Sequence, residues 1–205
     1  YKNQILMLDI LSKNDWKRPI YFTGGSYKDS EYIWMKDYLQ LDGLVYKLVP
    51  IKTPVNQENP YQLGRIEPNR MYNIIKKWEW GNSESPNIYH DPETRKNSIS
   101  FRGNLHRLAN EFIDRGEFEK ANEIMDLSFE KMPIDFFEYY SLSEPYILSY
   151  YKIGEDKKAQ NLYRTIEAKY LDQIKYYSIS MREYEDIFDL SEFAENIFTY
   201  TERYR

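Results

Sequence analysis

A helical hairpin pattern that returns at a near-constant interval constrains the second half of this chain most strongly. The stretch RGEFEKA holds Gly116 and, five residues later, Ala121; IGEDKKA repeats this order 38 residues further on, with Gly154 and Ala159. Glycine readily ends a helix, and a small residue on the next helix lets the two axes approach closely. The recurrence predicts helical hairpins that stack and bury one another.

Apolar stripes at helical spacing flank both glycines. They comprise Leu105, Leu108, Ala109, Phe112, Phe118, Ala121, Met125 and Ser128 around the first glycine, and Tyr146, Ile147, Tyr150, Ala159, Tyr163 and Ile166 around the second. We therefore expect two repeats, over residues 102–135 and 140–171. A pair over residues 172–205 fits the pattern badly, and we expect a degenerate terminal cap that includes a capping box at Asp189 and Glu192.

The first half predicts a small mixed α/β unit. A helix over residues 3–14 places Ile5, Leu8 and Leu11 on one face. The further expected elements are strands over 18–23 and 43–51, a helix over 31–39 capped by Asp29 or Ser30, and a helix over 69–80. Because a helix separates the two strands, they could pair in parallel as a small crossover unit.

A polar stretch over residues 82–98, with two prolines and no apolar period, predicts a linker. It divides the chain into a mixed unit over residues 1–98 and a helical repeat region over residues 99–205. The predicted fold class is mainly α: a hairpin array of the α-solenoid type, preceded by a small α/β unit with two short strands.

Composition excludes several classes of protein. The net charge is −5 and no long basic block is present, which argues against a nucleic-acid partner. The chain has no cysteine, so disulfides and thiolate chemistry are excluded. No apolar run approaches the ~18 residues needed to span a bilayer. The chain starts at Tyr1 without a methionine or a signal peptide, so we expect an excised soluble piece of a longer protein.

Catalysis and metal binding are not expected. His90, Asp91 and Glu93 form a weak set of possible metal ligands, but zinc needs three or four, so a loop histidine in water is favoured. The many carboxylates fall on exposed helix faces, and no serine lies in a nucleophile elbow. We predict no enzyme, no metal and no cofactor. The basic side chains of Arg95, Lys96, Arg102 and Arg107 are predicted to form a solvated face.

Two resemblances follow from these patterns. Residues 102–171 resemble tetratricopeptide repeats in their period and residue order, although Ser128 stands where alanine is usual. The stretches LDILSKNDWKRPIYFT and YLQLDGLVYKLVPI, within Leu8–Ile51, resemble the soluble C-terminal region of a Bacteroidetes family of multispanning membrane proteins. That family resembles protein O-mannosyltransferases in its membrane part and often ends in helical repeats.

The second resemblance implies that the catalytic carboxylates and the lipid-sugar site belong to a membrane segment outside this sequence. This chain would then be an extramembrane, periplasmic domain, joined to the membrane only through that N-terminal region. A stand-alone repeat protein would instead be cytoplasmic.

The expected function is that of a scaffold that binds a protein or peptide segment, in an oligomeric state that the sequence leaves open. By resemblance to other tetratricopeptide arrays, the groove residues are His106, Asn110, Ile113, Glu144, Leu148 and Tyr151. A groove that packs on itself or faces only solvent stays open as an alternative.

The alternative function is an accessory domain that binds a glycan or a lipid-phosphosugar. Its candidate contacts are Trp16, Arg18, Gly24, Gly25 and Ser26. A core tryptophan at a helix–strand junction and a plain tight turn are the simpler interpretations of these residues, and Trp78 and Trp80 are also interpreted as core residues.

Overall fold

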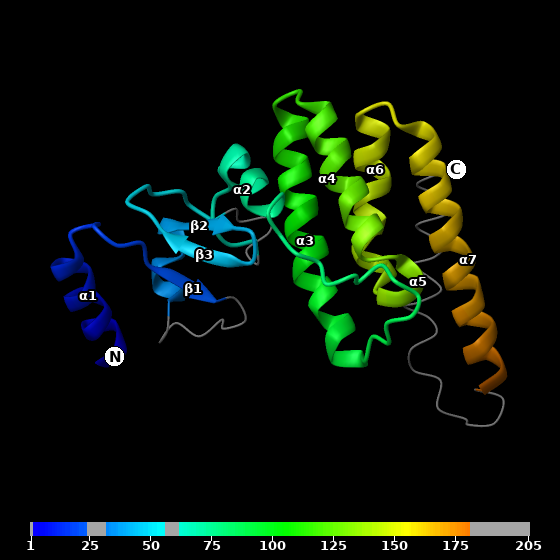
Figure 1. The fold of residues 1–205 in the computed structure, drawn as a ribbon, viewed down its shortest axis with the longest axis horizontal. Helices are drawn as coiled ribbons and strands as arrows, with labels where there is room; N and C mark the ends of the chain where they lie inside the picture. The colour runs from blue at the N-terminus through cyan, green and yellow to red at the C-terminus, as the bar shows by residue number, and fades with distance from the viewer. Residues whose placement is uncertain (1, 24–31, 56–61, 181–205) are drawn as a thin grey trace. The chain divides into compact units, whose positions relative to one another are not determined.

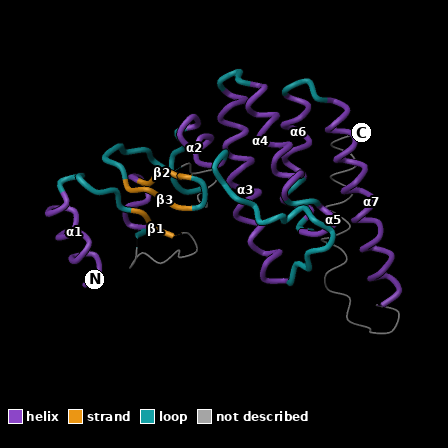
Figure 2. Tube along the Cα trace, in the orientation of Figure 1, coloured by secondary structure: helices purple, strands orange, loops and turns teal. Residues whose placement is uncertain are grey.

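The computed structural model describes residues 2–23, 32–55 and 62–180 of the chain (Figure 1). It divides into two compact units, Tyr1–Leu142 and Ser143–Arg205, and each is described by itself. Helices dominate the described residues, and a small sheet lies near the N-terminus (Figure 2). The predicted mainly α class with a small mixed unit ahead of it is confirmed, whereas stacking as a solenoid stays a prediction.

The sheet of the first unit has three antiparallel strands in the order β1-β3-β2. They are β1 (Tyr21–Thr23), β2 (Leu39–Asp42) and β3 (Val45–Leu48). The predicted parallel pairing is wrong, because β3 runs antiparallel to both neighbours. Gly43, at φ 73°, opens a two-residue turn that folds β3 back along β2. The predicted helix over 31–39 is a 3-10 helix, η1 (Ile33–Tyr38), while Asp29 and Ser30 lie outside the described residues.

Helix α1 (Lys2–Asn14) packs beside the core of this sheet. The core consists of Tyr32, Met35, Leu39 and Leu48, against which Met7 and Leu11 of α1 pack. The predicted inner face of α1 is therefore only partly right. Ile5 and Leu8 are exposed, because α1 is apolar on most of its circumference and only the side with Met7 and Leu11 meets the core.

Helix α2 (Pro68–Ile75) follows, shorter than predicted, and α3 (Pro92–Asp114) begins earlier than predicted. Asp91 caps α3 by accepting hydrogen bonds from the backbone N–H groups of Glu93 and Thr94. Pro92 fits the first turn because its missing N–H would have no partner there. The predicted linker over 82–98 is thus wrong from Pro92 onward.

Helix α3 pairs with α4 (Phe118–Lys131) in the first unit, and α6 (Glu144–Lys152) pairs with α7 (Asp156–Ser180) in the second. Between the hairpins in sequence lie α5 (Ile134–Phe137) and η2 (Tyr140–Leu142). The predicted stripes are buried except for Phe118, which is exposed, and Tyr163, which is half-buried. Helix α7 continues through residue 171, so the predicted new helix there is wrong. Residues 181–205, with Asp189 and Glu192, lie outside the described residues.

Both hairpins use the same turn. The N–H of Glu117 donates to the carbonyl of Phe112 at 2.9 Å, and Glu155 donates to Tyr150 at 2.9 Å. Each turn contains a glycine at positive φ, 73° in the first and 82° in the second. This left-handed residue satisfies the last helix carbonyls and reverses the chain. The turns of the two hairpins are therefore alike in backbone as well as in sequence.

One basic residue lies in the core of the first unit. Arg102 is fully buried on α3, where its Nη2 donates to the carbonyl of Met132 at 2.6 Å. Its guanidinium lies 4.9 Å from the ring centroid of Phe129. The predicted solvated face is wrong at this residue, because a main-chain carbonyl and an aromatic ring replace the water that the cation loses.

Candidate functional site

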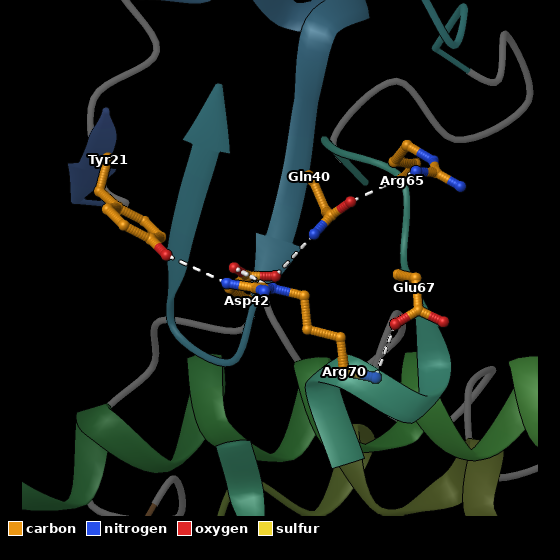
Figure 3. A network of polar contacts seen from close by, with 6 residues as sticks. All are labelled: Tyr21, Gln40, Asp42, Arg65, Glu67 and Arg70. Atoms are coloured by element: carbon orange, nitrogen blue, oxygen red, sulfur yellow. Dashed lines mark hydrogen bonds and ion pairs between the residues drawn. The ribbon is translucent and has the colours of Figure 1, made fainter. Parts of the chain in front are cut away.

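A polar network joins the sheet to the start of α2, with Asp42 at its centre (Figure 3). The Asp42 side chain is 2% exposed and accepts hydrogen bonds from Nε of Arg70 and Nε2 of Gln40, both at 2.9 Å. Arg70 also donates to the hydroxyl of Tyr21 at 3.3 Å, and Arg65 donates to Oε1 of Gln40 at 3.3 Å. Side chains from β1, β2, α2 and the segment before α2 thus meet at one carboxylate.

This network positions α2 and offers little for catalysis. Both oxygens of Asp42 accept hydrogen bonds from the protein, and its counter-ion is present. The bond to Asp42 raises the pKa of Arg70, which stabilises the charged pair. A general base instead needs a lone pair within reach of its substrate and a pKa near the working pH.

The first hairpin holds the loops of the sheet through two side chains of α3. Asn104 donates to the carbonyl of Gly43 at 2.9 Å, and Arg107 donates to the carbonyls of Leu63 and Gly64 at 2.9 and 2.7 Å. Burial lowers the pKa of Arg107, and its hydrogen bonds offset part of the cost of desolvation. Arg107 therefore also departs from the predicted solvated face.

Helix α2 lies against the same hairpin. Glu123 of α4 accepts hydrogen bonds from the hydroxyl of Tyr72 and the ammonium of Lys76. Tyr72 also meets the ring of Phe112 edge-on, with centroids 5.8 Å apart. The bond from Lys76, followed by that from Tyr72, lowers the pKa of Glu123 below its ordinary value. One side of the hairpin is thus occupied by the elements that precede it.

An aromatic-walled pocket of about 580 Å³ opens in the first unit. Its lining comprises Leu44, Trp78, Glu79, Trp80, Gly81, Ser83, Ile88, Tyr89, His90, Thr94, Asn97, Ser98, Phe101, Met132 and Phe137. The rings of Trp78, Trp80 and Phe101 form one cluster, with centroids 5.3–5.6 Å apart. Met132 and Phe137, which also line the pocket, are buried. The two tryptophans pack against Phe101 but are half-buried, so they are not the core residues that were predicted, and they line a pocket.

His90 belongs to this pocket rather than to open solvent. Its ring lies 4.5 Å from that of Phe137, and its Nε2 lies 3.0 Å from the carbonyl oxygen of Ser83. The prediction of a loop histidine in water is wrong, because α5 folds against it. In the described ranges, no three His, Asp or Glu side chains gather in a way that would hold a metal ion.

The predicted groove residues fall into two sets, one in each unit. His106, Asn110 and Ile113 share one flank of α3 and are half-buried. Asn110 Nδ2 lies 3.5 Å from His106 Nδ1. At 100° per residue, this flank lies about 120° around the helix from the flank of Asn104 and Arg107, which holds the loops of the sheet.

On α6 the predicted residues lie beside the buried stripe, about 120° around the helix from its centre. Leu148 is 48% exposed and Tyr151 is partly exposed, whereas Tyr146, Ile147 and Tyr150 of the stripe are buried. Glu144 accepts a hydrogen bond from the hydroxyl of Tyr170 on α7. Burial raises the pKa of Glu144, although this bond acts in the opposite direction.

The residues of the alternative site are only partly described. Trp16 is 54% exposed and has a positive φ of 56°, so the interpretation as a core tryptophan is wrong. Arg18 is exposed, and its backbone carbonyl accepts a hydrogen bond from the side chain of Asn14 at 2.7 Å. Gly24, Gly25 and Ser26 lie outside the described residues.

Residues 1–70 match the family model of the TMEM260-associated domain 2. The matched region holds α1, the sheet, η1 and the start of α2, and includes Leu8–Ile51, which carried the membrane-protein resemblance. It ends before the first hairpin and does not bear on the repeats. No curated protein and no solved structure matches the chain. Over the described part of the chain, no helix has both the length and the apolar character for a membrane crossing.

The pocket was missed from the sequence because its lining comes from distant segments. Trp78 and Trp80 are close in sequence, but Phe101 lies on α3 and Met132 follows α4. The available signal was local: two tryptophans separated by one residue, directly before a polar stretch with Ile88 and Tyr89. That pattern allows either packing or binding, and only the fold brings the segments together.

Proposed function

We propose that the chain is a non-catalytic protein-interaction module in the extramembrane, extracytoplasmic part of a membrane protein related to glycosyltransferases. The match over residues 1–70 supports a TMEM260-like parent. The resemblance of Leu8–Ile51 to a family related to protein O-mannosyltransferases supports the same assignment. In this proposal the chain holds a protein or peptide segment, and the chemistry belongs to the rest of the parent.

The observation that carries the docking role is the outer face of α6. Leu148 and Tyr151 stand about one turn apart on it, with Leu148 48% exposed, and Glu144 lies on the same side. Apolar anchors beside polar groups are typical of helix faces that bind an extended or helical segment. The shared turn of the two hairpins supports the resemblance of each hairpin to a tetratricopeptide repeat.

A peptide selection tests this function. A phage-displayed random peptide library is selected on the whole chain, and the affinity of the enriched peptides is measured by fluorescence anisotropy. We expect Leu148→Ala and Tyr151→Ala to weaken binding by about tenfold each, since truncation of an anchor costs roughly 1–2 kcal/mol. Asn161→Ala on the exposed side of α7 is the matched control and should leave affinity unchanged. Failure to enrich any peptide, or equal binding by the double variant, would contradict the proposal.

A second candidate function is contact with a glycan or a lipid-phosphosugar through Trp16 and Arg18. The exposure of the Trp16 indole supports it, because an exposed aromatic face next to a cation can stack on a sugar ring. Loss of saturable glycan binding in Trp16→Ala is the expected result. Calorimetry that shows no heat with a broad glycan panel would oppose this candidate.

A further inference from the structure

We propose that the pocket walled by Trp78, Trp80 and Phe101 is a binding site for a neutral saccharide. This inference concerns the first unit alone, and it stands whether or not α6 binds a protein segment. The pocket is also separate in sequence from Trp16 and Arg18, so a single set of variants distinguishes the two candidate sites.

The walls of the pocket are ordered by the fold. A Cβ atom at Gly43 would lie 2.7 Å from Cζ2 of Trp78, so the glycine of the β2–β3 turn leaves room for this indole. Phe101 meets Trp78 edge-on, with ring centroids 5.3 Å apart. The volume of about 580 Å³ falls within the range of small-ligand sites. A rigid aromatic wall favours a ligand with a flat or C–H-rich face, and sugar rings have such a face.

Several groups that can hydrogen bond remain available in this pocket. In the part of the chain that the structure describes, the side chains of Glu79, Tyr89 and Asn97 make no hydrogen bond or ion pair with the protein. Within the same described residues, the indole N–H groups of Trp78 and Trp80 also have no hydrogen-bond acceptor. Ser98, by contrast, already donates to a backbone carbonyl at 2.7 Å. Free donors and acceptors around an aromatic wall match a ligand that carries many hydroxyl groups better than a hydrocarbon.

The charge of the lining selects a neutral ligand. Glu79 is the charged side chain among the described lining residues, and they include neither lysine nor arginine. A phosphate group would meet a carboxylate without a compensating cation, which is unfavourable in a partly enclosed pocket. A lipid-phosphosugar is thus disfavoured here, and an uncharged mono- or oligosaccharide fits best.

NMR titration of the whole chain tests this site. Neutral disaccharides of glucose, mannose, galactose and N-acetylglucosamine are added while the indole N–H signals of the 4 tryptophans are followed. We expect the signals of Trp78 and Trp80 to shift saturably with at least one sugar. Tyr89→Ala and Asn97→Ala should each weaken this binding at least about threefold. Both residues are exposed, Tyr89 by 84%, so we expect both variants to keep the fold.

Trp16→Ala is the matched control and should leave the binding unchanged. The absence of a saturable shift with every sugar would overturn the inference. So would binding that Trp16→Ala removes while Tyr89→Ala and Asn97→Ala keep it. Measured at the Trp78 and Trp80 signals, tighter binding of a sugar phosphate than of the parent sugar would contradict the charge argument. Equal binding of n-octanol at these signals would contradict the role of the free polar groups.

Discussion

Asp42 shows how a single residue can hold several elements together. Its carboxylate is almost fully enclosed, whereas its partner Arg70 is 42% exposed. Loss of the carboxylate would leave Gln40 without an acceptor and Arg70 with water as a partial replacement. Removal of the Asp42 carboxylate should therefore cost more stability than breaking a surface ion pair, but less than breaking a fully buried ion pair.

We predict that Asp42→Ala lowers the free energy of unfolding by about 2–3 kcal/mol, because a buried donor loses its acceptor and a charge loses its partner. Urea denaturation followed by circular dichroism measures this change. Asp9→Ala removes an exposed carboxylate paired with Lys13 and should cost less than about 0.5 kcal/mol. Equal losses in the two variants would show that the network does not hold α2.

Two glutamates should give opposite pH dependences. The folded-state pKa of Glu123 is lowered by Lys76 and Tyr72, so its stabilising contribution is present above the unfolded pKa of about 4.3 and is lost as pH falls further. The folded-state pKa of Glu144 is raised by burial, so its contribution is present below about pH 4.3 and is lost as pH rises through the folded pKa.

Urea unfolding at several pH values checks these signs. Glu123→Gln should destabilise the chain at neutral pH and have less effect as the medium becomes acidic. The free energy of unfolding of Glu144→Gln, relative to that of the parent chain, should be higher at neutral pH than at pH values below about 4.3. If the stability difference from the parent chain changed with pH in the same direction for both variants, the environments inferred for Glu123 and Glu144 would be wrong.

At the scale of elements, the hairpin turns depend on two left-handed glycines. Gly116 and Gly154 have positive φ, and a Cβ atom would have open space at both. We predict that Gly116→Ala and Gly154→Ala each cost about 1 kcal/mol, purely through backbone strain. Gly103 lies inside α3, also with open space around it, and Gly103→Ala should stabilise by about 0.5–1 kcal/mol. Thermal unfolding measures all three, and a stabilising effect at either turn would contradict the turn geometry.

The elements also show what the sequence can predict. The hairpins were predictable because spacing, glycine and small residues are local signals, and Leu105, Phe112 and Ala121 are indeed buried. In the sheet, β1 and β3 lie within the predicted strands, but β2 and the antiparallel pairing were missed, because the turn at Gly43 folds β3 back along β2. The exposed side of α1 and the burial of Arg102 were missed for a related reason. Both depend on contacts with residues that are distant in sequence, and the periodicity of apolar residues does not predict such contacts.

At the scale of the whole molecule, the chain consists of two compact units with different candidate roles. The first carries the TMEM260-associated match, the polar network and the aromatic pocket. The second carries the exposed face of α6. The predicted groove residues belong to both units, so a groove across them remains a prediction. The docking role of the α6 face is argued from the exposure of its own residues.

The central claim, that the outer face of α6 docks a protein segment, is tested most directly by mapping a selected peptide on the intact chain. Backbone amide NMR signals are followed as the peptide, or a scrambled version of it, is added. The account predicts saturable shifts centred on Leu148 and Tyr151, and none with the scrambled peptide. Shifts confined to other surfaces, such as the pocket around Trp78 and Trp80, would contradict it.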